Sequence, residues 1–172
     1  MDDTAIEVRL GKPADAKGIL DCLLLTLSEH TWFDRDENES GITNPDVLGI
    51  KISQFKLGEK AYIVAVDQDK VVGFILLVRG GLHSVRHTCD LGMSLLPEYR
   101  EKGIGSRLLQ AAIDWTRQHG MDKIYCSTFN TNHRAVRLYE KFGFEREGVR
   151  RKQYKIAGEY VDQILFGKLL NA

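Results

Sequence analysis

The chain has 172 residues, of which 43% are hydrophobic and 28% are charged, and this size and composition predict a single globular domain over residues 1–172. Its 24 lysines and arginines balance its 24 aspartates and glutamates, so it lacks the basic field that drives binding to nucleic acids or anionic membranes. No stretch reaches the roughly 18 apolar residues that cross a bilayer, and the chain opens on acidic rather than basic and apolar residues. We therefore expect a cytoplasmic protein with no nucleic-acid or membrane partner.

The cysteines and histidines give no sign of a metal site. Cys22, Cys89 and Cys126 are widely spaced, and each lies in an apolar or strand-like run. They form no CxxC motif and no close Cys/His pair, and the five histidines lack metal-ligand spacing. We expect reduced thiols in the core and no bound metal.

Segments of helical periodicity alternate with runs rich in β-branched residues. In chain order they predict a strand at 6–10, a helix from 13 to about 28, a short helix at 45–56, strands at 61–66, 71–79 and 87–96, a helix at 103–119, a strand at 123–128, a helix at 132–142 and two final strands divided by a turn at 157–159. Residues 31–45 are too polar for a core and are expected to form a loop that could lie over a cleft. This order predicts a mixed α/β fold, with one sheet and helices on both of its faces.

Residues 97–106, Pro-Glu-Tyr-Arg-Glu-Lys-Gly-Ile-Gly-Ser, join a strand to a strongly amphipathic helix. Two glycines at a helix start let backbone N–H groups approach an anion closely, and the helix dipole favours negative charge there. A GxGxxG dinucleotide motif would need glycine at the position of Leu108, and no GxxxxGK[ST] phosphate loop is present. What remains is Arg-x-x-Gly-x-Gly after a strand, with an ordinary helix opened by glycine as the alternative.

This loop resembles the coenzyme A pyrophosphate loop of the GNAT superfamily of N-acetyltransferases. Residues 132–144, Asn-His-Arg-Ala-Val-Arg-Leu-Tyr-Glu-Lys-Phe-Gly-Phe, are similar to the superfamily's other recognisable string, and the two stand in the expected order. The likeness extends over essentially the whole chain and is nearest to ribosomal-protein, amino-acid and phosphinothricin acetyltransferases. It implies a GNAT-like mixed, mostly antiparallel sheet of about seven strands, with a splayed parallel pair and about four helices on both faces.

The resemblance also implies a site for acetyl-CoA. The strands at 87–96 and 123–128 would part to admit the pantetheine arm, and Leu95 would offer its main-chain N–H and C=O to the pantetheine and the thioester oxygen. Backbone amides at the start of the following helix would contact the pyrophosphate, with two cationic side chains nearby and an asparagine that either contacts the coenzyme or caps a helix. The expected cofactor-binding residues are Leu95, Arg100, Lys102, Gly103, Ile104, Gly105, Ser106, Arg107 and Asn132. For Arg100 and Lys102, plain solvent exposure is the alternative.

The same resemblance assigns catalytic roles. Tyr139 matches the position whose hydroxyl faces the coenzyme sulfur, so it is expected to act as general acid, although a tyrosine on such a helix can also be a packed aromatic. Asp90 resembles the carboxylate base of the phosphinothricin-type enzymes, and a carboxylate buried without an ion-pair partner has a raised pKa. His87 is the alternative base. Glu29 is expected to hold the cation of the acceptor.

The resemblance implies an enzyme that moves an acetyl group from acetyl-CoA to a primary amine of a small molecule or peptide, by direct attack in a ternary complex. A non-catalytic acyl-CoA-binding sensor or partner-binding module is the alternative, and a larger acyl donor such as succinyl is a further possibility. If the protein assembles, a homodimer is the expected form. The basic run between residues 146 and 155 is interpreted as a solvated edge strand, with recognition of RNA or an acidic substrate as the alternative.

Overall fold

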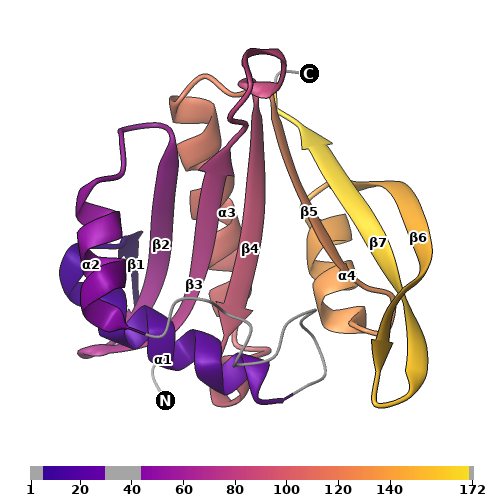
Figure 1. Ribbon diagram of the computed structural model, residues 1–172, viewed down its shortest axis with the longest axis horizontal. Coiled ribbons are helices and arrows are strands. Elements are labelled where there is room, and N and C mark those ends of the chain that lie inside the picture. The colour runs from indigo at the N-terminus through magenta and orange to yellow at the C-terminus, as the bar shows by residue number, and fades with distance from the viewer. Residues whose placement is uncertain (1–5, 30–43, 171–172) are drawn as a thin grey trace.

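A computed structural model describes residues 6–29 and 44–170, which form a seven-stranded sheet in the order β1-β2-β3-β4-β5-β7-β6 (Figure 1). The strands are β1 (Ile6–Leu10), β2 (Lys60–Asp67), β3 (Lys70–Arg79), β4 (Thr88–Leu95), β5 (Lys123–Phe129), β6 (Glu145–Ile156) and β7 (Glu159–Leu169). The α-helices are α1 (Ala16–Leu27), α2 (Pro45–Ser53), α3 (Ile104–Gln118) and α4 (His133–Lys141), and short 3₁₀ turns lie at Pro13–Asp15, His83–Val85 and Pro97–Tyr99. Neighbouring strands are antiparallel except for β4 and β5, which are parallel. The predicted order of elements and the mixed, mostly antiparallel sheet are confirmed.

The helices cover both faces of the sheet, with α1 and α2 in front of it and α3 and α4 behind it (Figure 1). The hydroxyl of Thr26 on α1 donates to Ser94 of β4 at 3.3 Å, which places Ser94 on the α1 face. Successive side chains of a strand point to opposite faces, and Cys89 is five positions before Ser94 on β4. Cys89 therefore lies on the other face, where it hydrogen-bonds with Thr116 of α3. The hydrophobic core lies between the sheet and these helices, and the apolar stripe of α3 is buried in it.

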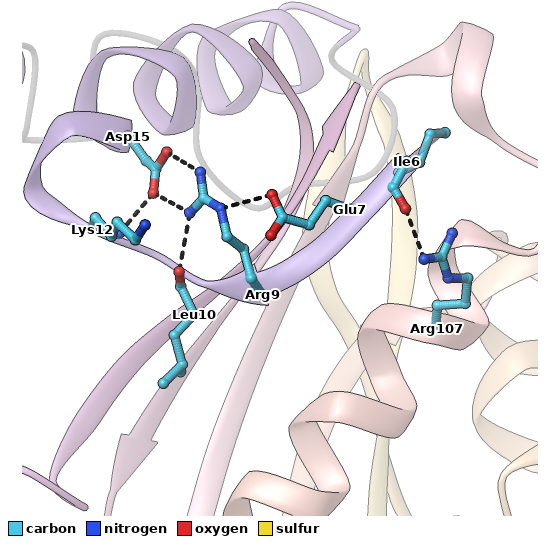
Figure 2. A network of polar contacts seen from close by, with 7 residues as sticks. All are labelled: Ile6, Glu7, Arg9, Leu10, Lys12, Asp15 and Arg107. Atoms are coloured by element: carbon cyan, nitrogen blue, oxygen red, sulfur yellow. Dashed lines mark hydrogen bonds and ion pairs between the residues drawn. The ribbon is translucent and has the colours of Figure 1, made fainter. Parts of the chain in front are cut away.

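Polar contacts fix the first strand to two helices (Figure 2). The guanidinium of Arg9 donates to both carboxylate oxygens of Asp15 at 2.7 and 2.9 Å, and the backbone N–H of Lys12 donates to the same carboxylate at 2.7 Å. On the opposite side, Arg107 of α3 donates to the main-chain oxygen of Ile6 at 2.7 Å. These contacts hold β1 against the start of α1 and against α3, so the sheet edge has a defined position.

The parallel pair β4–β5 opens partway along its length. Its ladder runs only from Thr88 opposite Lys123 to Asp90 opposite Tyr125. Beyond that point β4 stays paired with β3 and β5 stays paired with β7 to their ends, so the two strands diverge (Figure 1). The predicted splay is therefore present, and the inner edges of both strands offer backbone groups that the sheet does not use.

Two further observations concern the described part of the chain. None of its helices is long and apolar enough to cross a membrane. Within the same residues, no group of three or more His, Cys, Asp or Glu side chains is placed to hold a metal ion.

Candidate active site

A cavity of about 700 Å³ lies at the splay and is lined from both faces of the sheet. Thr26, Asp90 and Ser94 line it on the α1 face. Gly105 at the start of α3 and Tyr139 on α4 line it on the other face. A space of this size is within the range of small-molecule sites, and its lining reaches both faces of the sheet.

The start of α3 forms an anion cradle at one end of this cavity. Gly103 precedes the helix with a φ of +79°, a left-handed conformation that glycine adopts without strain. The amides of Ile104, Gly105 and Ser106 are the first of the helix, so no earlier turn supplies carbonyls for them. A Cβ on Gly105 would have only ordinary contacts, at 3.5 Å from Leu138, so this glycine leaves room for a ligand beside the amides.

Arg107 follows the cradle amides along α3. Its backbone N–H donates to the carbonyl of Gly103 at 3.1 Å. This is the first i to i−4 hydrogen bond of the helix, because Gly103 is the residue that precedes its first turn. Its side chain turns toward the carbonyl of Ile6 (Figure 2). The N–H of Arg107 and one nitrogen of its guanidinium thus already have partners within the protein, and a contact of Arg107 with the pyrophosphate stays a prediction.

Arg100 and Glu29 bind each other. The guanidinium of Arg100 donates to both carboxylate oxygens of Glu29, at 2.9 and 2.7 Å, and its Nε donates to the carbonyl of Leu95 at 3.0 Å. Both side chains are largely buried. The sequence placed Arg100 at the pyrophosphate and Glu29 at the acceptor cation, but the structure uses this bidentate pair to tie the end of α1 to the end of β4.

This pairing also involves the main chain of Leu95. The N–H of Leu96 donates to Val72 of β3, so alternation along the strand turns the N–H of Leu95 toward the splay. The carbonyl of Leu95 already accepts one hydrogen bond from Arg100, and its second lone pair can accept another. The contacts predicted for the Leu95 N–H and carbonyl stay predictions.

Two other predicted residues lie outside the cavity. Lys102 donates to the carbonyl of Glu98 at 2.6 Å and lies over the ring of Tyr99, so it folds back onto the preceding turn. His87 is exposed just before β4, and its main-chain oxygen accepts from Asp122 and Lys123. The structure does not bring the imidazole of His87 to the cavity lining.

Three cations of α4 line the cavity and were missed by the sequence reasoning. Arg134, Arg137 and Lys141 are spaced by three and four residues, which places them on one face of the helix. Their positive charge lies beside the same cavity as the glycine cradle, so they are candidates for holding the phosphates of coenzyme A. The spacing was visible in the sequence, but it is also typical of a solvated helix face.

Tyr139 lines the cavity from α4 and is only 4% exposed. Its ring packs between Phe144 and Phe166, with centroids at 5.5 and 5.6 Å, and its hydroxyl is a hydrogen-bond partner of Cys126. Burial is the main cause that raises the pKa of the Tyr139 hydroxyl well above its ordinary value, with the neighbouring Cys126 and Asp90 adding to it. The hydroxyl is therefore protonated throughout the physiological pH range. Both sequence interpretations, packed aromatic and proton donor, are compatible with this position.

Asp90 is at the last rung of the β4–β5 ladder and lines the cavity. The sequence predicted a buried carboxylate, but the side chain is exposed to this space. Partial desolvation by the surrounding protein still raises the pKa of Asp90, and a backbone hydrogen bond at Leu91 opposes this shift. The raised pKa has the direction that the sequence reasoning expected, with an open cavity rather than a closed core around the group.

Asn132 occupies both of its predicted settings. Its side-chain oxygen accepts from the N–H of Ala135 at 3.1 Å, which caps α4, and the residue also lines the cavity. The capping interpretation is thus confirmed. A contact with the coenzyme stays a prediction.

A polar cluster on β5, β6 and β7 was not found from the sequence. The side-chain nitrogen of Gln163 donates to the hydroxyls of Ser127 and Tyr154 at 2.8 and 3.0 Å, and its oxygen accepts from Arg150 at 3.3 Å. Ser127, Tyr154 and Gln163 all line the cavity. The cluster joins β5 to the hairpin of β6 and β7 across the intervening helix α4, so no local motif marks it.

The three cysteines are all buried and free. Burial raises the pKa of the Cys22 thiol to about 12 and that of Cys89 to about 11, and it raises the pKa of Cys126 further. Each is a neutral thiol near pH 7, and none is among the residues that line the cavity. The prediction of buried cysteines is confirmed, and none of them is suited to act as a nucleophile.

Known proteins resemble this chain in both sequence and structure. The family model described as Acetyltransferase (GNAT) family matches residues 25–144. The L-amino acid N-acetyltransferase of Escherichia coli (strain K12) is 28% identical over 139 residues, which cover 78% of this chain and 73% of that protein.

Among solved structures, a GNAT-family acetyltransferase from Streptococcus pneumoniae superimposes with a TM-score of 0.86 at 24% identity, over 96% of this chain and 99% of that one. An acetyltransferase from Salmonella typhimurium, solved with its cofactor acetyl-CoA, gives a TM-score of 0.86 at 18% identity, over 97% of this chain and 95% of that one. These two likenesses establish the fold, and the family model spans more than half of the chain. The chain therefore belongs to the acetyltransferase (GNAT) family.

Proposed function

We propose that the protein transfers an acetyl group from acetyl-CoA to a primary amine of a small molecule or peptide, by direct attack in a ternary complex. The observation that most supports this is the cavity through the splay, with the glycine cradle on one face of the sheet and Asp90 on the other. A donor held at the cradle and an amine held at Asp90 would meet between β4 and β5. Acetyl-CoA supplies the activated thioester.

On the donor side, the amides of Ile104, Gly105 and Ser106 would hold the pyrophosphate, with the α4 cations Arg134, Arg137 and Lys141 beside them. The N–H of Leu95 is directed into the splay and would donate to the thioester oxygen, where negative charge develops during attack. Arg100 and Glu29 act indirectly, because their ion pair fixes the carbonyl of Leu95 and thereby the peptide plane next to it.

On the acceptor side, Asp90 would take a proton from the ammonium form of the amine, directly or through a water molecule. Only a neutral amine has the lone pair that attacks the carbonyl carbon, and an α-amine of pKa about 7.7 to 8.0 needs less help than a lysine-like amine of pKa about 10.4. The hydroxyl of Tyr139, kept protonated by burial, would give its proton to the departing thiolate sulfur and would regain one, through water, from the nitrogen that loses its further proton as the amide forms. The two groups thus perform separate tasks on opposite sides of the splay.

The buried cysteines support direct attack. A covalent intermediate would need an activated nucleophile in the cavity, whereas every cysteine of the chain is buried and has a raised thiol pKa. We therefore expect that no acetyl group stays on the protein.

Initial-rate kinetics test this proposal. Thiol release from acetyl-CoA is followed while acetyl-CoA and an amine are varied independently, and intersecting double-reciprocal lines are expected. Parallel lines, or radiolabelled acetyl retained on the protein after mixing with acetyl-CoA alone, would contradict direct attack. Binding of acetyl-CoA without thiol release for any amine would favour the sensor alternative.

Three features of the wider biology stay predictions from the sequence. They are a single domain over the whole chain, a cytoplasmic location and a homodimer.

A further inference from the structure

The acceptor side of the cavity contains a polar array that the transfer chemistry does not use. Gln163 is buried at the centre of this array, between Ser127 of β5 and Tyr154 of β6. Asp90 lines the same cavity from β4. The array therefore faces the region where an acceptor amine would meet Asp90.

The hydrogen bonds of Gln163 define which way its amide group is turned. The guanidinium of Arg150 has only donors, so the atom of Gln163 that it contacts at 3.3 Å is the oxygen. The amide nitrogen then directs its two hydrogens to Ser127 and Tyr154, at 2.8 and 3.0 Å. Both hydroxyl oxygens consequently act as acceptors toward Gln163.

A hydroxyl that accepts from Gln163 keeps its own O–H to donate elsewhere. Ser127 is exposed to the cavity, and within the described residues its hydroxyl has no other hydrogen-bond partner. Its proton is therefore available to a ligand. The ring of Phe129 packs against Tyr154 at 5.0 Å, which restrains the far side of the array.

The geometry of the sheet places this donor near Asp90. Asp90 is opposite Tyr125, and Ser127 is two positions further along β5, so it lies on the same face. Strand spacing and rise put the Cα atoms of Asp90 and Ser127 about 8 Å apart or slightly more where the strands diverge. A short molecule with a cationic group at one end and a hydrogen-bond acceptor next to it could contact both side chains.

From this juxtaposition we propose that the acceptor is an amine with an adjacent carbonyl oxygen, as in an α-amino acid or the N-terminus of a peptide, and that Ser127, oriented by Gln163, recognises that oxygen. The inference rests on the proposed acetyl transfer and specifies its acceptor class. The charges agree with it, because the described lining has two carboxylates, Asp90 and Glu101, and Glu101 precedes the glycine cradle by two positions, which leaves Asp90 for the acceptor side. A polyamine, with several positive charges and no carbonyl, would find one carboxylate and no use for the Ser127 donor on the acceptor side.

The test compares leucinamide with 3-methylbutylamine, which lacks the carboxamide group, and adds leucine and spermidine. Thiol release is measured with the full-length protein, and kcat/KM is expressed per concentration of neutral amine, because the α-amine of leucinamide has a lower pKa than an alkylamine. On this scale we expect kcat/KM for leucinamide to exceed that for 3-methylbutylamine by about tenfold or more, since the carbonyl adds one hydrogen bond to the cavity-facing hydroxyl of Ser127.

Two variants then test the residues. Ser127→Ala removes the donor, and Gln163→Glu replaces the amide by a carboxylate that accepts the Ser127 proton. Both variants should therefore bring the leucinamide to 3-methylbutylamine ratio, expressed per concentration of neutral amine, close to one. Ser84→Ala, an exposed serine at the His83–Val85 turn, is the matched control and should keep the wild-type ratio.

The outcomes separate this inference from the proposed function. Three results would overturn the acceptor class and leave acetyl transfer standing. They are equal efficiency for leucinamide and 3-methylbutylamine, a preference for spermidine, and a leucinamide to 3-methylbutylamine ratio that is unchanged in Ser127→Ala and Gln163→Glu. Thiol release with none of the four compounds, despite binding of acetyl-CoA, would overturn both.

Discussion

Gly105→Ala should separate the stability of the protein from its affinity for acetyl-CoA. The added Cβ would lie 3.5 Å from Leu138 and 4.0 Å from Leu95, which are ordinary contacts, so the fold accommodates it. Alanine favours the helical backbone by up to about 1 kcal/mol, which should raise the Tm of the free protein by roughly 2 to 4 °C. The same methyl group occupies the space beside the first amides of α3, where the pyrophosphate would approach.

The loss of binding can be estimated from one hydrogen bond. A hydrogen bond to a charged group contributes about 1.5 to 3 kcal/mol, so displacing one amide–phosphate contact should weaken binding by roughly 10- to 100-fold. Isothermal titration with acetyl-CoA measures this, with Gly81→Ala as the control, because a Cβ at that exposed glycine meets no atom within 4 Å. An unchanged Kd in Gly105→Ala would show that α3 does not hold the pyrophosphate.

Tyr139→Phe should lower kcat by about 100-fold and leave the Kd of acetyl-CoA nearly unchanged, because the ring packing is kept and only the proton donor is lost; turnover equal to wild type would remove Tyr139 from the mechanism. Asp90→Asn should abolish the rise of the rate with pH, since a base works only above its own pKa, which desolvation raises here; an unchanged profile would move the role to another group. The same raised pKa means that Asp90 disfavours the folded state once pH rises through it, so thermal unfolding at pH 7 should show Asp90→Asn to be more stable than wild type. Asp15→Asn should cost about 1 to 3 kcal/mol in urea unfolding at pH 7, because it breaks the ion pair with Arg9. The lowered pKa of Asp15 stabilises the fold above the ordinary carboxyl pKa, and this contribution is lost as pH falls through the folded pKa. A difference between wild type and variant that does not shrink as the pH is lowered would contradict this account.

The fold was predictable because its signals are local. The two helices that border the coenzyme side begin at residues that can be read directly, Gly103 with its positive φ and Asn132 with its capping side chain. The turn between β2 and β3 was also visible, since the four polar residues 67–70 separate two apolar, β-branched runs. Each of these features depends on neighbours within a few positions in the sequence.

The side-chain directions in the site were not predictable in the same way. Arg100 turns away from the cradle because Glu29, 71 positions earlier, ends up beside it when α1 packs on the sheet. Arg107 is similarly drawn to the carbonyl of Ile6, 101 positions away. A basic residue next to a phosphate loop predicts a phosphate ligand only if no acceptor elsewhere in the chain competes for it, and a sequence does not show that competition.

The polar array on the acceptor side was missed for a related reason. Gln163 contacts Ser127 and Tyr154 only through the register of β5, β7 and β6, and that register includes an irregularity between Arg150 and Tyr154. Strand patterning predicts which residues alternate between faces but does not predict which partners a bulge brings together. The polar residues therefore looked like ordinary solvated positions of two C-terminal strands.

Whether the cavity binds acetyl-CoA is the central question, and a thermal-shift titration answers it most directly. The purified protein is heated with acetyl-CoA, and separately with NADH and with ATP, at concentrations up to the millimolar range. A ligand at 100 times its Kd adds about 2.7 kcal/mol, so acetyl-CoA alone should raise the Tm by roughly 5 to 10 °C. No shift with acetyl-CoA at saturating concentration, or an equal shift with all three compounds, would contradict the assignment of the splay and the glycine cradle to acetyl transfer.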